Sequence, residues 1–300
     1  MQTPVGPRTY VVTGADSGLG RAAADRLAGQ GRVITCGLGG EMDVRADLTT
    51  PQGRVELVER VRGLSDGRVD GVLAAAGAGA PRPETAALNY FGAVEVLEGL
   101  RGCLAVSDAP AAVVVSSSST LNRGSVALAR ACLRGDEAGA LAIAGRLIRT
   151  RRGSQIYRSS KLALNLWVRS AAVTAQWAGQ GIVLNAVAPG IIATEAVTRS
   201  WPQERLLLET ALPQPLGSPG PVESVADLLA YLVSPGNRFM TGQIVYCDGG
   251  TDALMRRGRP QRVFLRYRMR DMAVMWREAR RLARETPTPS PAAGGREGDA

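Results

Sequence analysis

The chain has 300 residues, of which 45% are hydrophobic, only 4% are aromatic and 36 are glycine, a composition typical of α/β enzymes. It contains no histidine, which excludes histidine-based catalysis and the commonest metal ligand. The net charge of +9 equals that of residues 256–284 alone, where eleven arginines outnumber Asp271 and Glu278. The basic character therefore belongs to one segment and does not indicate a nucleic-acid enzyme.

The cysteines and the apolar segments indicate a cytoplasmic protein. Cys36, Cys103, Cys132 and Cys247 are far apart and lack the spacing of a metal site, so we expect reduced thiols. No stretch reaches the roughly 18 to 20 apolar residues of a membrane-spanning helix. A strand-like run begins within the first ten residues, so we expect no signal peptide.

Strand-like apolar runs alternate with helical patterns along most of the chain. The runs fall at 9–13, 33–36, 71–75, 112–116, 182–186 and 243–246. Strands that are apolar throughout and alternate with helices are typical of a parallel sheet covered on both faces. We therefore expect a single doubly wound α/β domain, whose ligand lies beyond the carboxyl ends of the strands.

A glycine-rich turn directly follows the first strand and opens a helix. Gly14 permits a tight turn, Gly18 lets the backbone approach a pyrophosphate, and Gly20 lets the helix pack closely on the strand. The free N–H groups at the positive end of the helix would then meet the phosphates. The turn predicts a dinucleotide site; the alternative is a glycine-rich turn without a ligand.

Residues 120–153 form an insertion before the next long helix. Their pattern predicts helix from about Ser125 to Ile148, with Gly135 and Gly139 marking a break. The segment carries no convincing second catalytic set.

Tyr157 and Lys161 lie four residues apart on a helix expected from Gln155 to Ala178. Four residues is just over one turn, so both side chains project from the same face. An ammonium one turn away stabilises the phenolate and lowers a tyrosine pKa that is otherwise about 10. The pair is a candidate for general acid–base catalysis, although by itself such a pair is weak evidence.

After Gly250 the α/β pattern ends. Residues 256–285 predict a basic amphipathic helix, and its apolar stripe consists of Leu265, Met269, Met272, Trp276, Ala279 and Ala283. Such a helix would bind an anionic membrane surface or a protein partner, or it would dock on its own domain or on a second subunit. Residues 286–300 are rich in proline, glycine and small residues, and we expect them to be disordered.

Several motifs of this chain occur, in the same order, in the short-chain dehydrogenase/reductase family. They are Thr13-Gly14-xxx-Gly18-x-Gly20, Ala75-Ala76-Gly77, Asn89-Tyr90-Phe91-Gly92, Ser116-Ser117, Tyr157-xxx-Lys161 and Pro189-Gly190. From Arg8 to about Met255 the chain therefore resembles this family. The 40 residues from Ser117 to Tyr157 exceed the usual separation and resemble the bacterial 3α-hydroxysteroid dehydrogenase/carbonyl reductase branch.

The resemblance implies a Rossmann-type catalytic domain at residues 1–255. Within it, residues 120–153 would be the helical insertion and residues 190–215 the substrate lid. The basic helix at 256–285 and the tail at 286–300 would be extensions of this single domain.

The resemblance also implies a set of catalytic residues. Tyr157 would exchange a proton with the substrate oxygen, and Lys161 would lower the pKa of Tyr157 and bind the nicotinamide ribose. Ser117 would polarise the same oxygen, although the serines beside it leave this assignment open by one position. Asn89 would hold a water that links Lys161 to solvent.

The cofactor contacts implied by the resemblance surround the carboxyl ends of the strands. They are Gly14, Ser17, Gly18, Leu19, Gly20, Leu38, Asp47, Leu48, Ala75, Ala76, Gly77, Tyr157, Lys161, Pro189, Gly190, Ile192 and Thr194. Leu38 stands where NAD-dependent relatives place an acid for the adenosine ribose, and no arginine or lysine follows it directly. Because a 2′-phosphate without a cation would lose its main binding energy, NAD(H) is favoured and NADP(H) is the alternative. Glu41 could reach the ribose instead.

The expected reaction interconverts a secondary alcohol and a ketone. The branch resemblance and the leucine-rich lid favour lipophilic, ring-containing small molecules such as steroids or natural-product ketones. Two alternatives remain open: an aryl or primary-alcohol dehydrogenase of the same family, and a non-catalytic cofactor-binding scaffold localised by residues 256–285. We expect no metal and no nucleic-acid partner, and the family implies a homo-oligomer, either a dimer or a tetramer.

Overall fold

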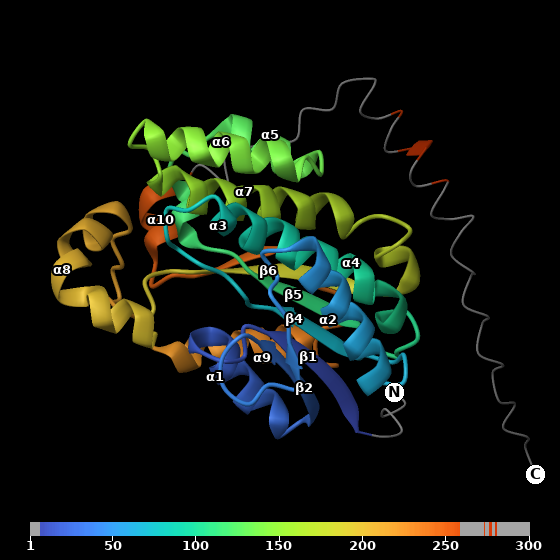
Figure 1. Ribbon diagram of the computed structural model, residues 1–300. Coiled ribbons are helices and arrows are strands. Elements are labelled where there is room, and N and C mark those ends of the chain that lie inside the picture. The colour runs from blue at the N-terminus through green and yellow to red at the C-terminus, as the bar shows by residue number, and fades with distance from the viewer. Residues whose placement is uncertain (1–6, 259–272, 274–275, 278–279, 281–300) are drawn as a thin grey trace, which may run out of the picture. The chain divides into compact units, whose positions relative to one another are not determined.

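Continuous apolar runs form the strands of a central sheet. In the part of the chain that the computed structural model describes (residues 7–258, 273, 276–277 and 280), seven parallel strands lie in the order β3-β2-β1-β4-β5-β6-β7 (Figure 1). They are β1 (Arg8–Thr13), β2 (Gly31–Gly37), β3 (Val44–Arg45), β4 (Gly71–Ala74), β5 (Ala111–Val115), β6 (Val183–Pro189) and β7 (Ile244–Cys247). The sheet confirms the expected doubly wound α/β fold, and β3 is a strand that the sequence pattern does not predict.

Helices cover both faces of this sheet (Figure 1). They are α1 (Gly18–Ala28), α2 (Pro51–Leu64), α3 (Glu84–Ala86), α4 (Ala93–Leu104), α5 (Val126–Leu133), α6 (Glu137–Arg149), α7 (Ser154–Ala171), α8 (Glu195–Ala211), α9 (Val222–Val233) and α10 (Thr251–Arg256). A π-helical segment, η1 (Ala87–Gly92), precedes α4, and short 3₁₀ turns form η2 (Ser118–Leu121) and η3 (Ala178–Gln180). α1 and α9 pack together on one face, whereas α2, α4 and α7 cover the other.

Alternate residues of each strand enter two separate apolar layers. Val11 and Val72 belong to the layer beneath α2, α4 and α7, and Tyr10 and Leu73 belong to the layer beneath α1 and α9. All four side chains are buried. Because both faces of the sheet are covered, the strands are apolar at nearly every position, which is the pattern that made them recognisable in the sequence.

The strand order reverses between β1 and β4. The chain runs from β1 outward to β2 and β3, returns to β4 beside β1, and then runs outward in the other direction to β7. A switch of this kind leaves a crevice beyond the carboxyl ends of the two central strands, where ligands bind in open α/β sheets. β1 ends at Thr13, directly before the glycine-rich turn, and β4 ends at Ala74.

The insertion at 120–153 contains α5 and α6. The Ser125 hydroxyl caps α5, and the Asp136 carboxylate caps α6 by accepting the amide of Gly139 at 2.8 Å. Gly135 ends α5 with a φ of +71°, as expected for a break. Gly139 does not mark the break, because it lies in the capped first turn of α6.

Arg54 of α2 joins the insertion to the rest of the domain. Its side chain is 1% exposed. The guanidinium donates to the carboxylates of Glu95 at 3.1 Å and Glu137 at 2.8 Å, and to the carbonyls of Leu48 at 2.9 Å and Thr49 at 3.1 Å. One buried cation therefore connects α2, α4, α6 and the loop that follows β3.

The helix that carries Tyr157 is shorter than expected. The sequence predicts Gln155–Ala178, but α7 ends at Ala171. There Thr174 donates its amide at 3.0 Å and its hydroxyl at 2.8 Å to the carbonyl of Ala171. A hydroxyl that bonds the nearby backbone competes with helix continuation, and the β-branched residues at this point favour the same outcome.

The chain divides into two units, Met1–Arg262 and Val263–Ala300. In the second unit Ala273, Trp276, Arg277 and Arg280 are helical, and the guanidinium of Arg280 lies 3.5 Å from the centroid of the Trp276 ring. Most of the helix expected at 256–285, and the tail expected at 286–300, lie outside the described residues. None of the described helices has both the length and the apolar character needed to cross a membrane.

Replacing Arg54 by methionine should destabilise the domain. Methionine retains part of the volume, but Glu137 and the carbonyls of Leu48 and Thr49 lose their donor, and breaking a buried ion pair costs about 3 kcal/mol. Urea unfolding should show this loss as a lower midpoint. The double variant Arg54→Met/Glu137→Gln should lose less than the sum of the single variants, because the Glu137 carboxylate is then no longer left without its partner. An unchanged midpoint for Arg54→Met would contradict this role.

Candidate active site

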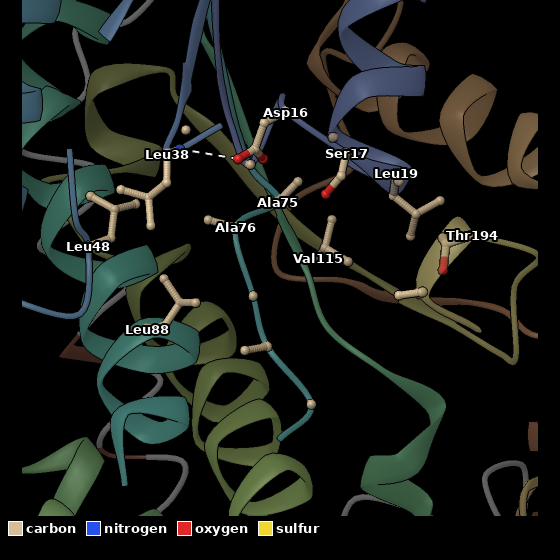
Figure 2. Close-up of a pocket in the computed structure, with 18 of the residues that line it drawn as sticks. Asp16, Ser17, Leu19, Leu38, Leu48, Ala75, Ala76, Leu88, Val115 and Thr194 are labelled. Atoms are coloured by element: carbon tan, nitrogen blue, oxygen red, sulfur yellow. Dashed lines mark hydrogen bonds between the residues drawn. The ribbon is translucent and has the colours of Figure 1, made fainter. Parts of the chain in front are cut away.

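A cavity of about 820 Å³ opens beyond the carboxyl ends of β1 and β4 (Figure 2). Its walls are the glycine-rich turn, the end of β2, the loop after β4, one face of α7 and the start of α8. The predicted site residues that line it are Gly14, Ser17, Gly18, Leu19, Gly20, Leu38, Asp47, Leu48, Ala75, Ala76, Gly77, Tyr157, Lys161 and Thr194. The fold therefore brings most of the predicted set to one place.

The remaining predicted residues do not line the cavity. Pro189 ends β6, Gly190 follows it, and Ile192 is buried in an apolar layer of the domain. Asn89 and Ser117 each bond to residues that do line the cavity. The expected nicotinamide contacts of Pro189, Gly190 and Ile192 stay predictions.

Three glycines of the turn are required by backbone geometry. A Cβ on Gly14, whose φ is +68°, would lie 2.8 Å from the backbone of Ala76. Gly18 also has a positive φ, +53°. A Cβ on Gly20 would collide with the carbonyl oxygen of Gly14. No larger residue fits at Gly14 or Gly20 without separating these segments.

The N-terminus of α1 faces the cavity with uncapped amides. Ser17 precedes the helix in an extended conformation, and its side chain accepts no hydrogen bond from it. Gly18, Leu19 and Gly20, which form the first turn of α1, all line the cavity. Free amides at the positive end of a helix bind phosphate. These donors and the glycine cradle fit the pyrophosphate of a dinucleotide.

Apolar side chains occupy the far side of the cavity. Leu38, Leu48 and Leu88 gather on one side, opposite Leu19 and Thr194 (Figure 2). Such a surface suits a planar ring such as adenine. Asp47, which the family resemblance assigns to the adenine, also lines the cavity, and its carboxylate accepts the amide of Thr49 at 2.9 Å.

Lys161 is buried on α7 with its charge directed at a main-chain carbonyl. Its side chain is 3% exposed, and Nζ donates to the carbonyl of Val115 at 2.6 Å. Burial lowers the pKa of Lys161 to about 8. Within the described residues no carboxylate forms an ion pair with it, so desolvation is not offset.

Tyr157 lies one turn before Lys161 and also lines the cavity. Burial raises the pKa of Tyr157, and a hydrogen bond with the side chain of Ser117 opposes this rise. This differs from the expectation that the ammonium lowers the pKa of the phenol. The physical reason is that desolvation disfavours the phenolate, while Lys161 points to Val115.

Four consecutive serines follow β5, and Ser117 is the one whose side chain acts to lower the pKa of Tyr157. Its Oγ also accepts the amide of Ser119 at 3.1 Å. The hydroxyls of Ser116, Ser118 and Ser119 are buried and make no hydrogen bond within the described part of the chain. The contact with Tyr157 supports Ser117 over its neighbours.

Asn89 holds the loop after β4 against α7. It lies within η1, and its side chain bonds both the amide and the carbonyl of Ala78 at 2.9 Å. A Cβ on Gly77 would lie 3.0 Å from Asn89 Oδ1 and 3.3 Å from Lys161 Nζ, so these groups lie close together. The water-holding role that the resemblance implies for Asn89 stays a prediction.

Several residues that line the cavity are absent from the predicted set. Asp16 lies in the glycine-rich turn, and Glu195, Ala196, Val197, Arg199 and Ser200 come from the start of α8. Asp16 could have been found as the only charged residue of the turn. The α8 residues carry no motif, and only the fold shows which of them face the cavity.

Comparisons with known proteins show which family this chain is similar to. A family model described as enoyl-(acyl carrier protein) reductase matches residues 14–252. The 3-alpha-hydroxysteroid dehydrogenase/carbonyl reductase of Comamonas testosteroni is 33% identical over 258 residues, which cover 82% of this chain and 97% of that protein. The cis-4-hydroxycyclohexanecarboxylate dehydrogenase of Sinomonas cyclohexanicum is 29% identical over 272 residues, covering 82% of this chain and 97% of that protein.

A solved structure is also similar. The 3-alpha-hydroxysteroid dehydrogenase from Pseudomonas sp. B-0831, complexed with NADH, is 34% identical, with a TM-score of 0.76 over 85% of this chain and 100% of that chain. The family model and the extent of these matches show that the chain belongs to the short-chain dehydrogenase/reductase family of oxidoreductases.

Proposed function

We propose that this protein interconverts a secondary alcohol and a ketone on a lipophilic, ring-containing small molecule, with NAD(H) as cofactor. The observation that supports the proposal is the position of Tyr157 at a cavity that fits a dinucleotide, one turn from Lys161 on α7. The side chain of Ser117 also acts to lower the pKa of Tyr157. Members of the family bind NAD(P)(H), and a bound nicotinamide would carry the hydride. The protein residues supply orientation and one proton.

The proposed roles follow from the geometry. The uncapped amides of α1 would bind the pyrophosphate, and Lys161 would donate to the nicotinamide ribose. Tyr157 would exchange a proton with the substrate oxygen, and Ser117 would stabilise the charge that develops there.

The protonation state of Tyr157 suits ketone reduction. Because burial raises its pKa, the phenol is protonated at neutral pH and can donate to a carbonyl oxygen. The reverse reaction needs the phenolate, which the charge of Lys161 would stabilise once the tyrosine gives up its proton. Lys161 is therefore proposed as the residue that makes both directions accessible.

The substrate assignment is supported by the lid and by the relatives. α8 has no buried residue, and Leu206 and Leu207 are 80% and 71% exposed. Exposed leucines on a helix whose first turns line the cavity suit a lipophilic substrate. The names of the similar proteins, a hydroxysteroid dehydrogenase and a hydroxycyclohexanecarboxylate dehydrogenase, point to cyclic secondary alcohols.

The proposal includes a homo-oligomer in the cytoplasm. Family members use small-molecule substrates and form oligomers, and the insertion of α5 and α6 beside α7 would change which surface is shared. The four cysteines are free, as expected for a reducing compartment.

Replacing Tyr157 by phenylalanine should remove turnover and leave cofactor binding intact. The variant lacks only the hydroxyl that moves the proton, so reduction of a cyclic ketone should slow by at least about 100-fold. The Kd for NADH, measured by fluorescence titration, should match that of the wild type. Tyr231→Phe is the matched control, because Tyr231 is exposed on α9 and does not line the cavity.

Two results would contradict the proposal. Wild-type rates in Tyr157→Phe would remove Tyr157 from the mechanism. Faster turnover of aryl or primary alcohols than of any cyclic ketone or alcohol would replace the substrate assignment with the aryl-alcohol alternative.

NADH binding should weaken as the pH rises through about 8. The pKa of Lys161 is lowered to about 8, so its charge is lost there, and a charge-assisted donor to the ribose is worth about tenfold in Kd. Kd values from pH 6.5 to 10 test this by fluorescence titration. Lys161→Met should bind more weakly and show no such change, whereas the same slope in that variant would assign the titration to another group.

The lowered pKa of Lys161 also makes the free energy of unfolding depend on pH in a defined direction. Between about pH 8 and 10.4 the unfolded chain holds a proton on Lys161 that the folded chain has released. The free energy of unfolding should therefore rise with pH across this window in the wild type, relative to Lys161→Met. Below pH 8 the relative stability should be constant, because both states then hold the proton.

A further inference from the structure

The end of β2 offers no acidic side chain to the cavity. Gly37 is the last residue of β2, and Leu38, which follows it, is 63% exposed and lines the cavity. In dinucleotide-binding folds an acid at this strand end accepts hydrogen bonds from the adenosine ribose hydroxyls. β2 itself carries no group for this purpose.

Asp16 of the glycine-rich turn brings a carboxylate to this strand end (Figure 2). Its Oδ2 accepts the amides of Leu38 at 3.2 Å and Gly39 at 2.9 Å. The main chains are joined as well, because the amide of Ala15 donates to the carbonyl of Cys36 at 3.2 Å. Asp16 also lines the cavity. The carboxylate is thus fixed between the turn and β2.

This carboxylate fills the space that a side chain on Gly37 would need. A Cβ built on Gly37 would lie 2.9 Å from Asp16 Cγ and 3.1 Å from Oδ2. An acidic side chain at position 37 therefore cannot fit while the Asp16 carboxylate stays where it is. The two amides use Oδ2, and Oδ1 makes no hydrogen bond to the residues that the structure describes.

Two arginines near the strand end are turned to other partners. Arg21 donates to the main-chain carbonyl of Asp16, Arg45 donates to that of Gly40, and neither lines the cavity. Among the described residues, the cations that do line it belong to α7 and α8. A 2′-phosphate placed beside Asp16 would meet a carboxylate and no cation from the cavity wall.

We infer that Asp16 is the residue that selects NAD(H) over NADP(H). Its Oδ1 accepts a hydrogen bond from the adenosine ribose, and its charge repels a 2′-phosphate. This inference rests on the proposed function, because it requires a dinucleotide in the cavity. Leu38 is apolar, and Glu41 does not line the cavity, so neither of these side chains is assigned this role.

Fluorescence titration of NADH and NADPH against wild type and Asp16→Asn tests the assignment. Asparagine keeps the shape and can still accept the two amides through its carbonyl oxygen, but it carries no charge. NADH binding should weaken about tenfold, as for the loss of one charge-assisted hydrogen bond, while NADPH binding should become tighter. A merely structural role would weaken both cofactors together.

Two further variants complete the test. Glu41→Gln is the matched control and should leave the ratio of the two Kd values unchanged. Asp16→Ala should lose the preference for NADH, and Asp16→Ala/Leu38→Asp should regain it, because Leu38 lines the cavity at the position where NAD-dependent relatives carry the acid. If the thermal melt of Asp16→Asn shows that this variant does not fold, Asp16→Ala and its double variant test the assignment instead.

The outcomes separate this inference from the proposed function. A wild-type preference for NADPH, or an unchanged ratio in Asp16→Asn, would overturn the role of Asp16 while leaving a dinucleotide enzyme. Failure of the wild type to bind either cofactor would overturn both.

Discussion

The close approach of backbone segments at the β1–α1 turn is the constraint on which the cavity depends. Gly14 lies against the backbone of Ala76, and Gly20 lies against the carbonyl of Gly14. A Cβ at either position would push α1 away from β1 or β1 away from the loop after β4. The uncapped amides of α1 would then no longer face the same space as Tyr157 and Lys161. The glycines thus act through steric exclusion, and the ligand chemistry comes from the groups that they allow to meet.

Tyr157 and Lys161 lie at one end of the cavity, and neither has a carboxylate partner within the described residues. Burial raises the pKa of Tyr157 and lowers that of Lys161, so each group alone is pushed toward its neutral form. A phenolate and an ammonium together carry no net charge, and the desolvation penalty of each is then partly offset by the other. The carbonyl of Val115 holds the Lys161 ammonium in place through a hydrogen bond, and the side chain of Ser117 favours the phenolate of Tyr157. In the proposed mechanism this balance would let a proton leave Tyr157 without help from a carboxylate or a histidine.

Much of this arrangement could be predicted from local sequence patterns. The strands of the sheet follow from apolar runs, and their observed ends lie close to the predicted ones. Helix geometry alone predicts that the side chains of Tyr157 and Lys161 project from the same face of α7. What depends on contacts between distant segments could not be predicted. β3 is only two residues long and is defined by its pairing with Cys36 and Gly37. The end of α7 depends on how Thr174 bonds to Ala171, and the α8 residues that face the cavity carry no motif.

Asp16 shows why a position in the sequence is a poor guide to a position in space. A motif places the ribose-binding acid after β2, so its absence at Leu38 suggests that the function is lost or reached from elsewhere. The turn that holds Asp16 already runs beside the end of β2, because the backbones of Ala15 and Cys36 are hydrogen-bonded. A side chain as short as that of aspartate then suffices to reach the amides of Leu38 and Gly39. Hydrogen bonding and charge repulsion depend on where the carboxylate lies and not on which strand carries it. A glycine at position 37 is therefore best understood together with an acid at position 16, since the first makes room for the second.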